Sequence, residues 1–165
     1  RARSCRGVGS GKEWQPTLTK LRQNSALRHL AEAIQAERNA AYLNSGQDVR
    51  VTPEQAMEEA LAELAAAIER EANACETVVG KHAARWRIRA MKTRWGSCNV
   101  RTAAITLNLQ LAQYDVRALR YVITHELTHL WVRGHDARFY ARMDRYFPHW
   151  QNVRRELNAW ARIDP

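Results

Sequence analysis

The stretch from His125 to His135, HELTHLWVRGH, places three histidines and a glutamate close together in a chain that has only 6 histidines. A His-Glu-x-x-His string with a third histidine at one fixed later position would arise by chance in fewer than about one such chain in a thousand. On a helix, His125 and His129 lie on one face about 6 Å apart, so both imidazoles can reach one ion. Glu126 lies one step round that face, where it can reach a water on the metal. The motif therefore indicates a helix that carries a metal site with a base beside it.

The residues in front of the motif predict that its helix is largely buried. From Asp115, the sequence DVRALRYVITHELTHLWV has apolar side chains at helical spacing, including Leu119, Val122 and Leu130. Histidine and glutamate side chains buried in such a helix cost free energy unless they have partners. A metal that satisfies all of them is the simplest interpretation.

His135 cannot join the other two histidines from a straight helix, because it would lie about 15 Å further along the axis than His125. We therefore predict that the helix ends at Gly134, in a left-handed conformation, and that the chain then turns back. Three nitrogen ligands with an open fourth position are typical of a catalytic zinc site, so we expect one zinc per chain, bound by His125, His129 and His135. Cys98 is the next candidate ligand if His135 does not bind. The alternatives are that the first two histidines are satisfied core residues and that His135 caps the helix or faces solvent.

Length and cysteine content exclude several classes of protein. The 165 residues suffice for a single core, and we find neither an apolar run of 18 residues nor a signal-peptide pattern. Cys5, Cys75 and Cys98 are odd in number and widely spaced, which argues against a disulfide framework and fits a reducing compartment. We expect a soluble, cytoplasmic protein that does not associate with membranes, and the sequence does not indicate its oligomeric state.

The net charge of +9 lies entirely in the part of the chain that holds the motif. Residues 82–165 carry 15 Lys and Arg against 6 Asp and Glu, whereas residues 1–81 carry 11 of each kind. A basic surface attracts polyanions or acidic substrates, so we expect weak, salt-sensitive association with nucleic acid or nucleotides. The alternative is that these arginines form an ordinary solvated surface. No strand combines aromatic and basic residues in the way that stacks single-stranded bases.

The pattern of apolar residues divides the chain into three segments. Residues 1–16 are rich in Gly, Ser and Arg and lack periodicity, which is typical of a flexible leader. Residues 17–80 are predicted to form a helical scaffold. Residues 81–165 are predicted to form the core that holds the motif, so that the chain has one catalytic domain overall.

Two helices are predicted in the scaffold. The first runs from about residue 17 to Leu43, where LNSGQD interrupts the helical pattern. The second has Thr52 as its N-cap, Pro53 in its first turn and Gln55 as the partner in a capping box, and it continues to about Cys75.

From Trp86 the apolar period changes from helical to alternating. The runs WRIRAMK, RWGSC and AAITLNL predict three short antiparallel strands, which would give the motif helix a sheet on which to pack. After His135, Asp136 is a candidate N-cap for one helix, and Pro148 starts a last helix that runs to the end. The fold class that these elements predict is α+β.

Four stretches, MKTRWGSCN, ITLN, YVITHELTHL and GHDARFY, resemble in their order the YgjP-like metallopeptidase family, relatives of the SprT-like zinc proteases, over about residues 80–150. The resemblance implies a zincin-like α+β fold with N-terminal helices, a small antiparallel sheet, the HExxH helix and C-terminal helices. It also implies that the three histidines of the motif bind zinc and that Glu126 is the catalytic base. The strand RWGSC would belong to the core beside the site.

We therefore predict a zinc-dependent metallohydrolase that acts as a metallopeptidase on peptide or protein substrates. Zinc lowers the pKa of its water, and Glu126 takes the proton and passes it to the leaving group. Tyr140 and Arg138 are candidates for stabilising the oxyanion, with packing and surface roles as the alternative. An edge strand near residues 105–108 would hold an extended peptide by strand addition.

Two other functions remain open from the sequence. One is hydrolysis of a nucleotide phosphoanhydride, which the basic half favours, although we find no Gly-rich phosphate loop or acidic metal cluster. The other is a non-catalytic zinc-containing module associated with DNA. Glu126 argues against the second, because a purely structural zinc site has no use for a carboxylate beside the metal.

Overall fold

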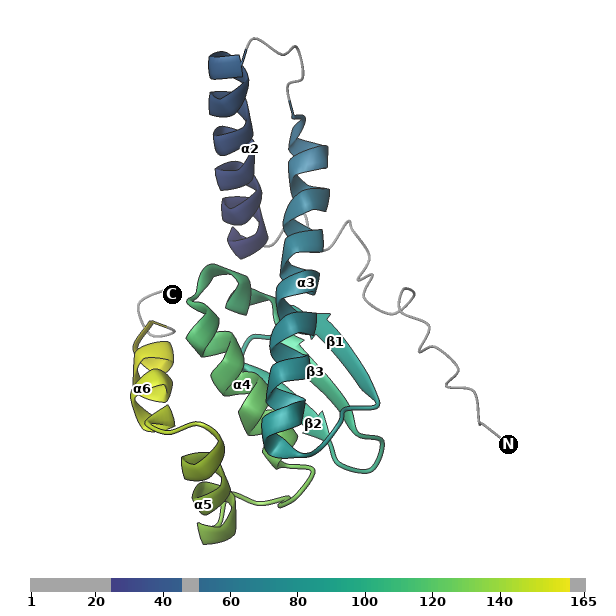
Figure 1. Ribbon diagram of the computed structural model, residues 1–165, viewed down its shortest axis with the longest axis vertical. Coiled ribbons are helices and arrows are strands. Elements are labelled where there is room, and N and C mark those ends of the chain that lie inside the picture. Colours follow the sequence, from purple (N-terminus) through teal and green to yellow (C-terminus); the bar gives the residue numbers. More distant parts are fainter. Residues whose placement is uncertain (1–24, 46–50, 161–165) are drawn as a thin grey trace, which may run out of the picture.

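The computed structural model describes residues 25–45 and 51–160, which form an α+β fold as predicted. The predicted leader, residues 1–16, lies outside this part. Figure 1 shows α4 between α3 and α6, with the sheet packed against it. The elements, in chain order, are α2 (Ser25–Ser45), α3 (Pro53–Val79), β1 (Arg85–Arg89), β2 (Gly96–Asn99), β3 (Ala104–Asn108), the 3-10 helix η1 (Leu109–Gln113), α4 (Val116–Thr128), α5 (Ala137–Tyr146) and α6 (Trp150–Trp160).

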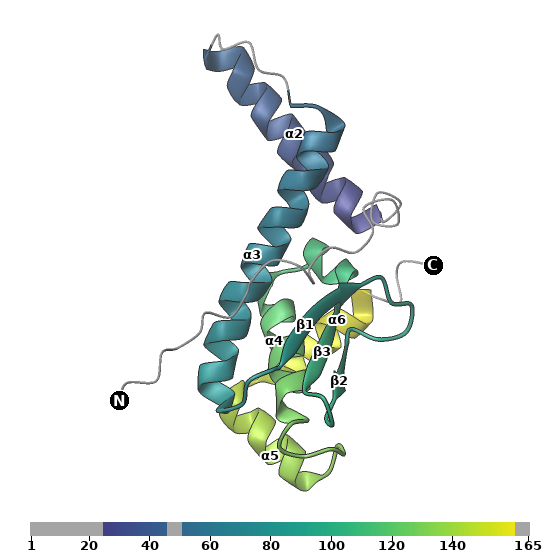
Figure 2. The same cartoon turned by 90° about the vertical axis from the view of Figure 1, so that its right-hand side faces the viewer.

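The scaffold helices α2 and α3 pack against each other and run in opposite senses, crossing obliquely (Figures 1 and 2). The predicted capping box at the start of α3 is confirmed, because Thr52 Oγ1 accepts a hydrogen bond from Gln55 N at 3.2 Å and Gln55 Oε1 accepts one from Thr52 N at 2.9 Å. The helix continues one turn beyond the predicted end at Cys75 and stops at Gly80, whose φ of 70° is left-handed. The predicted first turns of the first helix, before Ser25, lie outside the described residues.

The sheet is mixed, with strand order β1-β3-β2, so the prediction of three antiparallel strands was wrong in its pairing. β1 pairs with β3 in parallel, with Trp86 opposite Ile105, and β2 pairs with β3 antiparallel, with Cys98 opposite Ile105. The prediction treated strands that are neighbours in sequence as neighbours in space. β3 lies instead between two strands that run in opposite directions, and it can be antiparallel to only one of them.

This order also corrects the predicted peptide-binding edge. Residues 105–108 belong to β3, which is hydrogen-bonded on both sides and has no free edge. The edge strands are β1 and β2. Ile105 and Leu107 of β3 are fully buried, which is consistent with a central strand that faces α4.

α4 lies at the centre of the core. It begins where predicted, with the Asp115 side chain accepting a hydrogen bond from Arg117 N at 2.6 Å. Val122, Ile123 and Leu127 are buried under the sheet and the scaffold. Figure 2 shows the sheet in front of α4, so the face of the sheet that does not contact α4 is turned toward the viewer. Among the described residues, no helix is long and apolar enough to cross a membrane.

The helix α4 ends at Thr128, earlier than the predicted end at Gly134. The next turns are tighter, with Leu130 N donating to Leu127 O at 3.0 Å, and the Trp131 indole donating to Val79 O at 2.9 Å. The bond from Trp131 joins this turn to the last residue of α3. A helix that continued past Thr128 would carry the Trp131 side chain away from Val79. Gly134 does not adopt the predicted left-handed conformation.

Two predictions about the C-terminal helices can be compared with the structure. Asp136 caps α5 as predicted, because its carboxylate accepts hydrogen bonds from Arg138 N at 3.0 Å and Phe139 N at 3.1 Å. α6 begins at Trp150, two residues after the predicted start at Pro148.

Candidate active site

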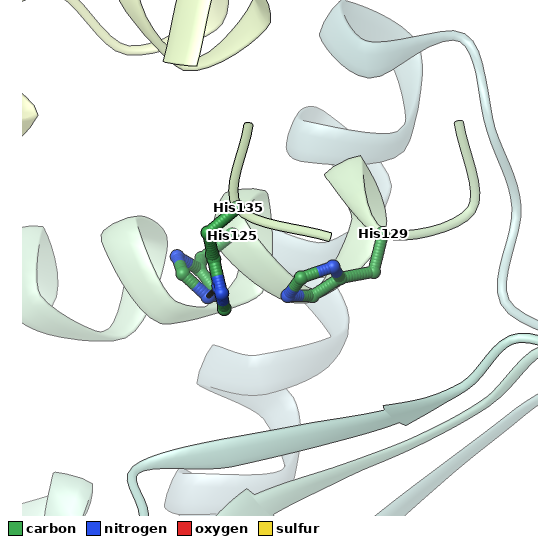
Figure 3. A group of neighbouring side chains, drawn as sticks. All are labelled: His125, His129 and His135. Carbon is green, nitrogen blue, oxygen red and sulfur yellow. Dashed lines mark hydrogen bonds between the residues drawn. The ribbon is translucent and has the colours of Figure 1, made fainter. Parts of the chain in front are cut away.

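Three histidines from two consecutive segments converge on one point (Figure 3). His125 lies in α4, His129 is the residue that follows its last turn, and His135 comes from the turn before α5. One ring nitrogen of each lies within 4.8 Å of the other two. The early end of α4 makes this possible, because the chain reverses between His129 and His135. The structure therefore brings together all three residues that the sequence proposed as metal ligands.

The donor atoms fit a divalent metal. Nε2 of His125 and Nε2 of His135 face each other at 3.0 Å, and two nitrogens bound to one tetrahedral zinc would lie about 3.3 Å apart. Nδ1 of His129 lies 3.2 Å from the carbonyl oxygen of Val132. With its proton on Nδ1, that ring donates to the carbonyl and leaves Nε2 free for a metal.

The environment of His125 does not resemble that of a satisfied core histidine. Its Nδ1 atom is buried and has no hydrogen-bond partner in the described part of the chain. Burial, helped by the neighbouring His129 and His135, lowers the pKa of His125 to about 3. Burial also lowers the pKa of His129. Both rings are therefore neutral at physiological pH, and each keeps a lone pair for coordination.

The Phe139 ring packs against all three histidine rings. Its ring is fully buried, and its centroid lies 4.9 Å from His125, 4.7 Å from His129 and 4.8 Å from His135. The capping of α5 by Asp136 fixes the first turn of the helix on which Phe139 lies. The sequence analysis did not single out Phe139 for the site, because one apolar residue in an amphipathic helix is usually only part of a core.

Glu126 is buried beside the histidines, with 6% of its surface exposed. It makes no hydrogen bond or ion pair with any described residue. Burial raises the pKa of Glu126 to about 8, although the positive charge of Arg94 acts in the opposite direction. A carboxyl group with a pKa near neutrality can both accept and donate a proton under ordinary conditions.

The first residue of β2 determines how much space Glu126 has. A Cβ atom added to Gly96 would lie 2.7 Å from Oε1 of Glu126 and 2.9 Å from Cγ1 of Val122. No larger residue fits there without moving the carboxylate, so the strand that resembled the family motif does lie against Glu126. Cys98 of the same strand is half-buried, and burial with the nearby Glu126 raises its pKa to about 11. It is not part of the metal-binding group that the structure brings together.

The two weaker candidates lie on α5. The Tyr140 ring is half-buried, stacks on Trp150 at 5.6 Å and lies 6.5 Å from the His135 ring. Arg138 is exposed and pairs with Asp136 at 2.8 Å. Tyr140 is thus next to the histidines, whereas Arg138 is engaged at the start of its own helix. The part that either plays in a reaction remains a prediction.

A hollow of about 200 Å³ opens beside Glu126 and His125. Arg154 and Asn158 of α6 form its wall opposite α4, and Tyr121 lies next to them. The sequence analysis missed all three. The four-residue spacing of Arg154 and Asn158 places them on one face of α6, but nothing in the sequence shows that this face lies against the motif helix.

Two solved structures match this chain in a structural comparison. The metallopeptidase zymogen of Pyrococcus abyssi abylysin is 20% identical, and the match covers 55% of this chain and 90% of that chain with a TM-score of 0.51. The metallopeptidase zymogen of Methanocaldococcus jannaschii jannalysin is 23% identical, with 58% and 96% covered and a TM-score of 0.49. At this level of identity, the abylysin match shows a shared fold. A comparison with curated protein sequences gives no significant match.

A family model described as the YgjP-like metallopeptidase domain matches residues 13–160. The match extends further toward the N-terminus than the resemblance seen over residues 80–150. A metallopeptidase family implies a divalent metal, and the three converging histidines are residues that could bind one. The chain therefore belongs to the YgjP-like metallopeptidase family.

Proposed function

We propose that the chain is a zinc-dependent metallopeptidase that binds one zinc through His125, His129 and His135. The observation that carries the proposal is the convergence of three imidazole nitrogens beside a buried glutamate that has no partner in the described residues. Imidazole donors with no carboxylate or thiolate among them suit zinc better than magnesium or calcium. The odd number and wide spacing of the cysteines in the chain support a reducing, cytoplasmic location for the protein.

When bound, zinc supplies a Lewis acid that polarises the scissile carbonyl and makes a water molecule easier to deprotonate. Glu126 accepts the proton of the attacking water on a carboxylate oxygen and later gives it to the leaving amine. Its burial favours both steps, because the raised pKa brings the two protonation states close in free energy at neutral pH. Gly96 keeps the carboxylate in place, and Phe139 holds the three imidazoles in position.

Next to Glu126 lies an edge strand of the described sheet with which an extended substrate would pair. β2 is an edge strand that begins against Glu126, and main-chain pairing along that edge would place a peptide bond near the histidines. Tyr140 is our candidate donor to the oxyanion because it lies beside His135. Arg138 is the weaker candidate because Asp136 already holds its guanidinium.

Replacing the base without changing its size tests this function. We expect Glu126→Gln to keep the fold and the zinc but to lose about a hundredfold to ten-thousandfold or more of the peptide hydrolysis rate, because glutamine cannot accept the proton. Glu71→Gln is the matched control, because Glu71 is equally buried, with 6% of its surface exposed. Glu71 lies on α3, away from the histidines, and its carboxylate pairs with Arg120 of α4 at 2.8 Å.

The measurement is the rate of cleavage of a peptide library, with zinc content and melting temperature for each variant. Equal rates for wild type and Glu126→Gln at equal zinc content would rule out Glu126 as the base. The same preparations incubated with nucleoside triphosphates, with zinc and with chelator, test phosphoanhydride hydrolysis. Hydrolysis of nucleotides in the absence of any peptide cleavage would replace the peptidase proposal.

A second candidate function, association with nucleic acid, is supported by the outer face of the sheet. A hollow of about 490 Å³ lies there, lined by Arg85 and Arg87 of β1 and by uncharged polar residues of the other two strands. Alternate residues of a strand lie on the same face, so Arg89 extends this row of arginines. None of the residues that line the hollow is acidic, so a polyanion there would meet the positive charge of the arginines without an opposing carboxylate from the lining.

We expect weak binding of single-stranded and duplex DNA that falls steeply with salt and does not depend on base sequence. Arg87→Glu should weaken this binding more than Arg70→Glu, which makes the same change of charge at an exposed position of α3. The measurement is fluorescence anisotropy of labelled oligonucleotides at several salt concentrations. No binding at low salt, or equal losses in the two variants, would leave the sheet arginines as ordinary surface.

A further inference from the structure

The hollow beside Glu126 is placed to hold part of a substrate. It is bounded on one side by His125 and Glu126 of α4 and on the other by Arg154 and Asn158 of α6. Its volume of about 200 Å³ is below the range of about 300–1,000 Å³ that is usual for sites of drug-sized molecules, so it suits a single side chain. A group that occupies it would belong to a residue next to the bond that is cleaved.

The chemistry of the walls is uneven. Besides His125 and Glu126, the lining includes the apolar side chains of Val122 and Trp95, and α6 adds the guanidinium of Arg154 and the amide of Asn158. Burial raises the pKa of Tyr121 to about 12, and the charge of Arg154 acts in the opposite direction, which is consistent with a cation close to the phenol inside the hollow.

Among the described residues, Arg154 has no acidic partner of the kind that arginines at helix surfaces commonly have. Within the described residues it forms no ion pair, and its guanidinium lies 5.9 Å from the centre of the Trp150 ring. The acidic residue of its own helix, Glu156, pairs with Arg117 at 3.6 Å instead. A guanidinium presents a planar fork of donors that matches a carboxylate, and an amide N–H beside it can donate a further hydrogen bond.

We propose that this hollow is a subsite for a carboxylate on the peptide substrate, with Arg154 and Asn158 as its specificity-determining residues. The inference rests on the proposed peptidase function, because it assumes that a peptide bond lies over the three histidines. The carboxylate has two sources, an aspartate or glutamate side chain next to the scissile bond or the free C-terminus of a substrate. In the second case the enzyme removes residues from the ends of chains.

The test uses one cleaved peptide in matched forms. The residue next to the scissile bond is Glu, Gln or Lys, and each peptide has a free or an amidated C-terminus. We expect wild type to cleave the Glu form with a kcat/KM about tenfold to a hundredfold above the Gln form, the range of a charge-assisted hydrogen bond. A preference that instead follows the free C-terminus identifies the terminal carboxylate as the ligand.

Charge reversal at Arg154 provides the decisive variant. Arg154→Glu should abolish the preference for the carboxylate and favour the Lys peptide, and Arg154→Gln should abolish the preference without reversing it. Arg155→Glu is the matched control, because Arg155 is the adjacent exposed residue, hydrogen-bonds to Asn152 and does not line the hollow. Melting temperature and zinc content show whether each variant is folded.

A binding measurement keeps the two proposals apart. In the Glu126→Gln background, the affinity for labelled Glu and Gln peptides reports on the subsite without turnover. Tighter binding of the carboxylate form that is lost in Arg154→Glu would support the subsite even if wild type cleaved no peptide, a result that would count against the peptidase proposal alone. Equal affinity and equal cleavage of the Glu and Gln peptides, with free or amidated ends, would overturn the subsite, as would equal losses in Arg154→Glu and Arg155→Glu.

Discussion

α4 carries polar side chains toward two different neighbours, and the two sides differ in the partners that they find among the described residues. Toward α3, the Thr124 hydroxyl donates to Cys75 Sγ at 3.5 Å, and Arg120 pairs with Glu71 at 2.8 Å. Toward the histidine site, Glu126 has no hydrogen bond or ion pair in the described residues, and His125 Nδ1 has no partner there. One helix thus has a satisfied side and an unsatisfied side.

This difference in pairing distinguishes polar groups that stabilise the fold from polar groups that are available to bind a ligand. Buried polar groups in folded proteins are nearly always paired, so one that is unpaired among the described residues needs an explanation. Asn39 Oδ1 of α2 also lacks a partner among the described residues, but the three histidines are the group there that could hold a metal ion. A metal held by the three histidines, with a water beside it, would give Glu126 the partner that the described residues do not supply.

Among changes to the residues packed around the site, the largest effect on the peptidase rate is expected from filling the space over Glu126. Gly96→Ala places a methyl group 2.7 Å from the carboxylate, so the base must move, and a displacement of about 1 Å can cost about a hundredfold in rate. A loss of about 1–3 kcal/mol in unfolding free energy should accompany it. Gly134→Ala is the control, because an added Cβ there meets nothing within 4 Å. A normal peptidase rate in Gly96→Ala would show that the position of Glu126 does not matter.

The next effect concerns the aromatic support under the histidines. Phe139→Ala should lower the unfolding free energy by about 3–5 kcal/mol, because a fully buried ring is removed. Phe139→Leu keeps an apolar side chain, and we expect a smaller loss of stability with zinc affinity reduced about tenfold to a hundredfold, as for other groups that orient metal ligands. Denaturant unfolding and zinc competition with a chelator measure the two quantities. Unchanged zinc affinity in Phe139→Leu would reduce Phe139 to a packing residue.

The smallest effect is expected on the satisfied side of α4. Thr124→Val removes the hydroxyl that donates to Cys75, and it should cost less than about 1 kcal/mol of unfolding free energy because a sulfur atom is a weak acceptor. Zinc content and peptidase rate should stay at wild-type values. A tenfold fall in rate for Thr124→Val would mean that the two sides of α4 are coupled and that the comparison between them fails.

Features set by local chemistry could be predicted from the sequence. The capping box at Thr52 and the start of α4 at Asp115 each depend on a few consecutive residues, and both are present. The meeting of His125 and His129 follows from helical spacing. The prediction that His135 joins the other two histidines is also confirmed. The predicted cause was wrong, because the helix ends at Thr128 and not at Gly134.

Features set by contacts between distant segments could not be predicted in this way. The end of α4 depends on the Trp131 indole reaching Val79, 52 residues away. The order of the strands depends on the insertion of β3 between β1 and β2. The close approach of Gly96 to Glu126 also joins residues that are far apart in the chain. Periodicity reports which face of an element is apolar but not which partner covers it.

Zinc content per chain most directly tests whether the unsatisfied side of α4 is a metal centre. Wild type and single alanine variants of the three histidines are stripped with chelator, reloaded with zinc and analysed by mass spectrometry of the metal. His29→Ala is the control, because this histidine is exposed on α2. We predict one zinc per chain in wild type, His29→Ala and Glu126→Gln, and a large loss in His125→Ala, His129→Ala and His135→Ala. Full retention in His135→Ala alone would remove that residue and direct attention to Cys98, whereas no zinc in wild type, or one zinc per chain in all three histidine variants, would contradict the metal centre.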